Sequence, residues 1–213
     1  MISPFNSKFL SPTKLFRRLS VMLAINETSR KSQHAIGRQT HLSSSMVNNY
    51  IKTLQRDGLI RVTGDTNRTQ RYHLTDEGRD VLREDFLCYS AEIVQLYGAV
   101  KSEISSILRE FHEEDIRTVV LFGVAETAEV VHAAMKQTGL VIVGVVDSDT
   151  EKQGQPFNGL VIQHPEMLQQ MQPDAVLITS FGRQEEIYAT VKSLVKADVK
   201  IKRLSKHPMA VGI

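Results

Sequence analysis

This chain of 213 residues has a single cysteine, Cys88, no tryptophan, and only 6% aromatic residues. One cysteine excludes an internal disulfide and any cysteine-rich metal site. We expect Cys88 to be a small packed residue of a helix, with a redox sensor as the alternative. No apolar run is long enough to cross a bilayer. A signal peptide would need an apolar segment soon after Met1, and the sequence has none there. We therefore expect a cytoplasmic protein with no membrane partner.

Acidic residues are scarce in the first third of the chain. Residues 1–75 contain 12 Lys and Arg against 3 Asp and Glu, a net charge of +9. The remainder contains 14 basic and 21 acidic residues, a net charge of −7, so the overall +2 hides the asymmetry. An electropositive segment attracts polyanions, while an acidic remainder limits non-specific adhesion. The pattern favours nucleic acid as the partner of the N-terminal part. The 7 histidines have no metal-ligand spacing, and we expect no metal site.

Residues 43–56 read SSSMVNNYIKTLQR and have the apolar spacing of a helix, which Ser43 is suited to cap. The residues that fall largely off the apolar stripe are Ser44, Ser45, Asn48, Asn49 and Lys52. The amide of asparagine matches the N6 and N7 groups of adenine, serine is less selective, and lysine suits phosphate. Taken alone, an ordinary solvated helix surface is the better interpretation. The flanking segments change it.

Upstream, residues 32–42 read SQHAIGRQTHL, which is typical of a first helix and a tight turn, with His41 in a left-handed conformation. Downstream, two short strands at 59–62 and 72–74 flank a polar turn that begins at Gly64. The hairpin carries Arg61, Arg68 and Arg71. A charged edge that resists aggregation would explain these arginines. Their place beside the polar helix makes contact with phosphates the better interpretation.

Residues 12–82 resemble the winged helix-turn-helix of MarR-type transcription regulators, especially the small ones associated with exopolysaccharide gene clusters. The strings that carry the resemblance are SQHAIGRQTHLSSSMVNNYIKTLQRDGLI and RYHLTDEG. The resemblance implies that double-stranded DNA is the partner. It also implies that Ser44, Ser45, Asn48, Asn49 and Lys52 are major-groove positions and that Arg68 and Arg71 are wing positions.

From Asp76 to about His112 the pattern predicts one long helix without proline. Its apolar stripe is heptad-like with one phase shift and consists of Leu82, Phe86, Tyr89, Ile93, Leu96, Val100, Ile104, Ile107 and Phe111. A small wing domain cannot bury so long a stripe. We therefore expect a homodimer through the helix at 82–111, with packing on the chain's own second domain as the alternative.

Beyond residue 114, apolar β-branched runs alternate with helical segments, which predicts a doubly wound parallel sheet. The expected fold is α/β overall. It comprises a winged helix-turn-helix domain at 1–82, a linking helix at 76–113 and a Rossmann-like parallel-sheet domain at 114–213.

The segment GVAETA at 123–128 approximates the dinucleotide fingerprint G-x-G-x-x-G/A. Ala125 replaces the second glycine, and Glu126 opposes an anionic ligand. Asp147 follows the second strand, where an acidic residue can hold a ribose hydroxyl. Candidate ligand-binding residues at the strand ends are Gly123, Ala125, Asp147, Ser180 and Arg183. A nucleotide or nucleotide-sugar is the expected ligand and NAD(H) is less favoured; a purely structural or partner-binding domain is the alternative.

Three segments of this second domain carry a further resemblance, VVLFGVAETAEVV, VIVGVVDSDTEKQGQPFNGLVI and PDAVLITSFGRQEEIY. They resemble the Rossmann domains of polysaccharide-biosynthesis and sugar-nucleotide-modifying proteins, and the whole architecture is similar to that of Rex-type repressors. We expect a DNA-binding transcription regulator with a small-molecule effector and no enzymatic activity. The competing hypotheses are an enzyme or accessory protein of sugar-nucleotide metabolism and a Rex-like NAD(H) redox sensor. The spacing Tyr188-x-x-x-Lys192, which short-chain dehydrogenases use, is the one enzymatic feature.

Overall fold

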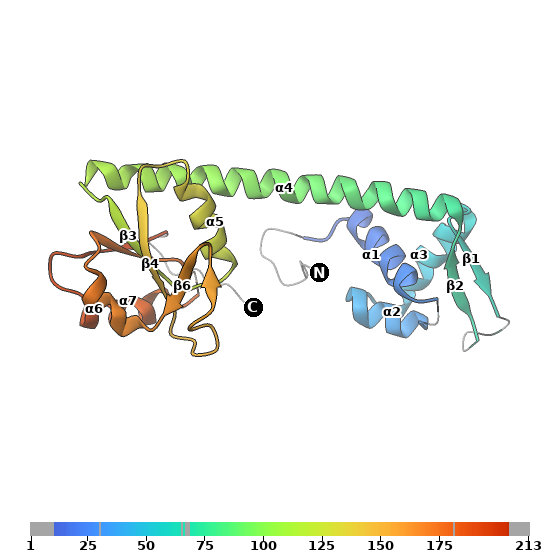
Figure 1. Ribbon diagram of the computed structural model, residues 1–213. Helices are drawn as coiled ribbons and strands as arrows, with labels where there is room; N and C mark the ends of the chain where they lie inside the picture. Colours follow the sequence, from blue (N-terminus) through green and yellow to red (C-terminus); the bar gives the residue numbers. More distant parts are fainter. Residues whose placement is uncertain (1–10, 30, 65, 67–68, 181, 205–213) are drawn as a thin grey trace. The chain divides into compact units, whose positions relative to one another are not determined.

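The computed structural model describes residues 11–29, 31–64, 66, 69–180 and 182–204. The chain forms two compact units, and the boundary between them falls after Val94, within helix α4 (Asp76–Glu113). The remaining elements of the N-terminal unit are α1 (Lys14–Glu27), α2 (Gln33–Thr40), α3 (Ser44–Arg56), β1 (Ile60–Thr63) and β2 (Arg71–Leu74). Figure 1 labels these elements and colours them in the order of the sequence. The predicted winged helix and long helix are confirmed.

Hydroxyl side chains cap the N-termini of α1, α2 and α3. Thr13, Ser32 and Ser43 each accept a hydrogen bond from the backbone N–H three residues later, at 3.1, 3.2 and 3.3 Å. Each cap satisfies a donor that the first helical turn leaves free, as predicted for Ser43. The turn after α2 closes at His41, whose φ of 54° confirms the predicted left-handed conformation.

The start of α4 is anchored to the wing. Thr75 caps the helix by accepting from the backbone N–H of Gly78 at 3.0 Å, and its hydroxyl donates to the carbonyl of Gly58 at 2.8 Å. A methyl group on Gly78 would lie 1.9 Å from the carbonyl oxygen of Leu59, so only glycine permits this approach. The core of the unit is built mainly from α1, α3 and the inward side chains of the hairpin, including Met22, Leu54 and Tyr72.

The C-terminal unit is a six-stranded sheet with helices on both faces. Its strands are β3 (Thr118–Phe122), β4 (Val141–Val146), β5 (Pro156–Phe157), β6 (Leu160–Gln163), β7 (Ala175–Ile178) and β8 (Lys200–Arg203). Their order is β5-β6-β4-β3-β7-β8, and every pair is parallel except β5 with β6. The helices are α5 (Glu126–Met135), the 3-10 helix η2 (Pro165–Met167), α6 (Leu168–Met171) and α7 (Gln184–Leu194).

Alternation along β3 divides the core into two layers. Val119 and Leu121 pack with α5 and the last turns of α4, whereas Val120 and Phe122 pack with α6 and α7. The chain starts in the middle of the sheet at β3, continues outward through β4 and β6, and returns to β7 on the other side of β3. The strand order thus reverses at β3, and this point of an open α/β sheet is where ligands bind.

The sequence did not predict β5, a two-residue strand that pairs antiparallel with β6. Asn158 and Gly159, with positive φ values of 48° and 88°, turn the chain between the two strands. Among the described residues, no helix combines the length and the apolar character needed to cross a membrane.

Candidate nucleic-acid interface and ligand edge

The predicted major-groove residues share one surface of α3. Ser44, Ser45, Asn49 and Lys52 are exposed, and Asn48 is half-buried. The opposite side of the helix holds Val47, Ile51 and Leu54 in the core. A buried apolar face therefore fixes the orientation in which the polar face meets solvent.

The wing presents a second polar surface. Register pairs Arg61 with His73 and Thr63 with Arg71, while Tyr72 and Leu74 face the core. Because side chains alternate along a strand, the two paired sets lie on the outer face of the hairpin, namely Arg61, Thr63, Arg71 and His73. Arg61 and His73 are exposed. His73 was not among the predicted contact residues; its spacing of two from Arg71 was the signal for it.

Arg71 is partly committed within the hairpin. Its Nη1 donates to the carbonyls of Thr69 and Gln70 at 3.3 and 3.0 Å. Bonds to neutral carbonyls do not neutralise a guanidinium, so the positive charge of Arg71 can still attract a phosphate. Arg68, the other predicted wing residue, lies outside the described residues.

The apolar stripe of α4 is buried at both ends and exposed in the middle. Leu82 is buried in the core of the N-terminal unit, and Ile104, Leu108 and Phe111 are buried in that of the C-terminal unit. The predicted interface at 82–111 is therefore wrong at both ends, since these side chains already have partners within the chain. Large apolar side chains remain exposed between them at Phe86, Leu87, Val94, Leu96, Tyr97 and Val100.

Cys88 belongs to this middle segment and is exposed. The prediction that it is packed is wrong, because Cys88 lies on a side of α4 that no part of the described chain covers. Tyr89, by contrast, packs its ring against Phe16 of α1, with 5.2 Å between centroids.

All five candidate ligand residues lie at the carboxyl edge of the sheet, where β3, β4 and β7 end. Gly123 has a φ of 97°, and a methyl group built on it would lie 3.5 Å from Cβ of Ser180. Ala125 precedes α5 and offers no side-chain cap. The backbone N–H of Arg183 donates to the Ser180 hydroxyl at 3.4 Å. The sheet topology thus gathers residues from three separate segments.

Asp147 closes the loop after β3. The side chain is buried, and Oδ2 accepts from the backbone N–H of Val124 at 2.6 Å. Oδ1 accepts from the N–H of Asp149 at 2.9 Å. Lys152 completes the arrangement, since its Nζ donates to the carbonyl of Val124 at 2.8 Å and lies 3.5 Å from Oδ2. The carboxylate that was predicted to bind a ligand hydroxyl therefore binds backbone N–H groups of the protein itself. The N–H of Val124, which could donate to a phosphate, is thereby occupied.

Arg183, which directly precedes α7, is paired with a carboxylate of that helix. Its guanidinium forms an ion pair with Glu186, which raises the pKa of Arg183 through hydrogen bonding and charge, with a smaller contribution from Asp147 and Asp149. The same arginine lowers the pKa of Glu186. An anionic ligand would compete with this carboxylate for Arg183. Glu126 and Glu129 add negative charge in the first turn of α5, where a phosphate would otherwise be favoured.

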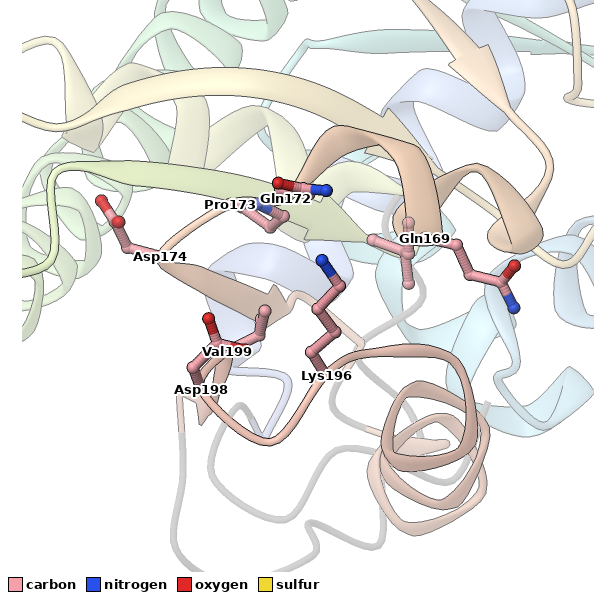
Figure 2. A pocket seen from close by; sticks show the side chains of 8 residues that line it. Gln169, Gln172, Pro173, Asp174, Lys196, Asp198 and Val199 are labelled. Carbon is pink, nitrogen blue, oxygen red and sulfur yellow. The ribbon is translucent and has the colours of Figure 1, made fainter.

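Two hollows lie on the unit, one at this carboxyl edge of the sheet and one at the opposite edge. One, of about 280 Å³, borders the ends of β4 and β6 and is lined by Ser148, His164, Pro165, Glu166, Thr190, Ser193 and Leu194. The other, of about 160 Å³, lies at the opposite edge, where β7 and β8 begin (Figure 2). Neither contains any of the five candidate ligand residues.

Asp174 borders the second hollow but serves the sheet. Figure 2 shows its carboxylate directed away from Lys196. Oδ2 accepts from the backbone N–H groups of Thr118 and Arg117 at 2.7 and 2.8 Å and from the Thr118 hydroxyl at 2.9 Å. These bonds, led by that from the Thr118 backbone, lower the pKa of Asp174. The carboxylate fastens the start of β3 to the start of β7.

Of the pair with dehydrogenase-like spacing, Tyr188 is engaged in packing, whereas Lys192 is exposed. Tyr188 contacts the apolar core on the α7 side of the sheet, and the guanidinium of Arg203 lies over its ring at 4.1 Å. A tyrosine stacked in this way serves the fold.

Comparison with known proteins separates the two units. Residues 17–88 match the family described as winged helix-turn-helix, and residues 115–202 match the family described as C2185-like, N-terminal. No curated protein matches the chain. The first match identifies the N-terminal unit as a winged helix-turn-helix domain and supports a DNA-binding regulator.

Solved structures resemble parts of the chain. The M. tuberculosis transcriptional regulator MosR is 16% identical, with a TM-score of 0.35, over 39% of this chain and 61% of its own. The PcaV transcriptional regulator from Streptomyces coelicolor, in complex with its natural ligand, is 25% identical, with a TM-score of 0.36, over 45% and 67%. UDP-D-quinovosamine 4-dehydrogenase from Vibrio fischeri is 16% identical, with a TM-score of 0.37, over 42% and 79%. The chain thus spans about three fifths of the length of MosR.

Proposed function

We propose that the protein is a homodimeric transcription regulator of the MarR-like kind, in which α3 enters the major groove and the wing follows the DNA backbone. The observation that carries the proposal is the exposed row of Ser44, Ser45, Asn49 and Lys52 on α3. It lies in the unit that matches the winged helix-turn-helix family. Short polar side chains at the start of such a helix can reach base edges, and the lysine suits a phosphate.

The charge of the chain supports this partner. The net charge of +9 over residues 1–75 provides the electrostatic attraction that DNA binding requires. The outer face of the wing adds Arg61, Arg71 and His73, whose positions suit the sugar-phosphate backbone. Such contacts hold the domain in register, while α3 supplies the base preference.

The middle of α4 supports a second copy of the chain as the dimer partner. Residues 86–100 read FLCYSAEIVQLYGAV and contain one charged residue, Glu92. A helical segment with apolar side chains on several faces needs a cover. Because this segment is nearly uncharged, two copies can pair without like-charge repulsion. A two-fold dimer would also place two recognition helices on a pseudo-palindromic site.

For the C-terminal unit we propose a Rossmann-like sensing domain whose ligand binds at the carboxyl edge around Gly123, Ser180 and Arg183. The carboxylates of Asp147 and Glu126 disfavour a diphosphate cradled at this loop. A nucleotide or nucleotide-sugar whose sugar or base makes most of the contacts fits better than NAD(H). A thermal-shift panel tests this proposal, since a ligand of the folded state raises the melting temperature. Tight binding of NADH would instead favour a redox sensor, and no shift with any nucleotide would leave the domain a structural one.

Mobility shift with the full-length protein tests the DNA-binding proposal. The probes are duplexes from the region upstream of its own gene and a pool of random duplexes. We expect a complex whose affinity falls steeply between low and moderate salt, because bound cations are released from the phosphates. Absence of salt-sensitive binding to any duplex would overturn the proposal.

A further inference from the structure

One side chain of α2 touches the predicted reading surface of α3. Nε2 of Gln33 donates to Oδ1 of Asn48 at 3.4 Å. Gln33 is the first residue of α2, directly after its cap Ser32. The two residues are 15 positions apart in sequence, and the turn at His41 brings them together. The bond therefore depends on the helix-turn-helix geometry.

The contact gives the adjacent residues Asn48 and Asn49 different surroundings. Asn48 is half-buried, and its carbonyl oxygen is turned toward α2. Asn49 is exposed, and within the described residues its side chain has no hydrogen bond. While Nε2 of Gln33 is the donor, the Asn48 amide keeps its plane and cannot exchange its N and O positions without losing the bond. Its NH₂ group, on the other branch, is left on the side away from Gln33.

We infer that Gln33 is a positioning residue that fixes the Asn48 amide so that its NH₂ group reads a base edge rich in acceptors. The inference rests on the proposed DNA binding by α3. The fitting acceptors in the major groove are N7 of a purine, O6 of guanine and O4 of thymine. A side chain already ordered in the free protein loses less conformational freedom on binding, so the preset amide discriminates more strongly than a mobile one.

The test begins with selection of a preferred duplex from a random pool by the full-length protein. Dissociation constants are then measured for that duplex and for its single-base variants with wild type, Gln33→Ala, Asn48→Ala and the double variant. We expect both single variants to lose discrimination at the same base pair, by roughly fivefold for Gln33→Ala, the size of one hydrogen bond. The double variant should lose no more than Asn48→Ala alone. Asn49→Ala should affect a different base pair.

His34→Ala is the matched control, since it removes the exposed neighbouring side chain on α2. It should leave the base preference unchanged, and the melting temperature of Gln33→Ala should equal that of wild type. Additive losses in the double variant, or unchanged discrimination with Gln33→Ala, would overturn the inference and leave the regulator standing. If no duplex can be selected at all, the proposed DNA binding itself is wrong.

Discussion

The carboxylate of Asp147, at the end of β4, accepts a hydrogen bond from the backbone N–H of Val124, in the loop after β3, at 2.6 Å. This bond joins the two central strand ends of the C-terminal unit. It also occupies a donor that a bound phosphate would use. The loop is thus organised by a carboxylate of the chain itself.

Replacing Asp147 with Ala should destabilise the C-terminal unit by about 1–3 kcal/mol, because the N–H groups of Val124 and Asp149 lose their acceptor. Urea unfolding followed by circular dichroism measures the loss. Asp149→Ala is the control, since it removes an equal charge from an exposed neighbour. Equal stability of the two variants would show that the Asp147 bonds contribute nothing specific.

Substitutions on α3 and on the wing should affect DNA binding differently. Asn48→Ala with Asn49→Ala should lower the preference for the selected duplex more than binding to random duplex, because these amides suit base edges. Arg61→Ala with Arg71→Ala should weaken binding to all duplexes and reduce the slope of log K against log salt by about 1–2. Filter binding over a salt series measures both effects. Arg109→Ala, an exposed arginine of α4 in the other unit, should change neither.

Charges placed in the middle of α4 should separate the dimer. Ile93→Asp with Val100→Asp should yield a monomer in light scattering, since two carboxylates would face an apolar partner. Operator affinity should fall with it, because one half-site binds weakly. Ser102→Asp with Ser106→Asp adds the same charge at exposed polar positions of the helix and should leave the mass unchanged. A mass of one chain for the wild type at micromolar concentration would contradict the proposed assembly.

The stability of the C-terminal unit should depend on Asp174 only above acidic pH. Its pKa is lowered in the folded state, chiefly by the backbone N–H of Thr118, so the ionised form stabilises the fold. This contribution is complete above the unfolded-state pKa of about 4 and is lost as the pH falls through the lowered folded-state value. The difference in unfolding free energy between wild type and Asp174→Asn should be constant from about pH 5 to 7 and shrink toward about pH 2. A difference independent of pH would exclude this carboxylate as the cause.

The sequence by itself determined the elements that depend on local chemistry. Hydroxyl caps such as Ser43 and Thr75 mark where helices begin, and apolar period distinguishes helix from strand. The left-handed backbone at His41 was also predictable, because many turns of this kind carry glycine at that position and histidine tolerates positive φ. Strand ends carrying Gly123 and Asp147 could be assigned to one edge, since the carboxyl ends of parallel strands meet there. Among the strands of the described residues, β5 was missed, because it has two residues and no alternation to detect.

The tertiary structure decided how those residues are used. It gave the oxygens of Asp147 to backbone donors and paired Arg183 with Glu186. It also divided the stripe of α4 into buried ends and an exposed middle and placed Gln33 against Asn48. The periodicity of apolar residues shows which face of a helix or strand a side chain lies on. The residue that it contacts comes from a segment distant in sequence. Hydrogen-bond capacity is finite, so a residue's availability to a ligand depends on contacts that exist only once the chain has folded.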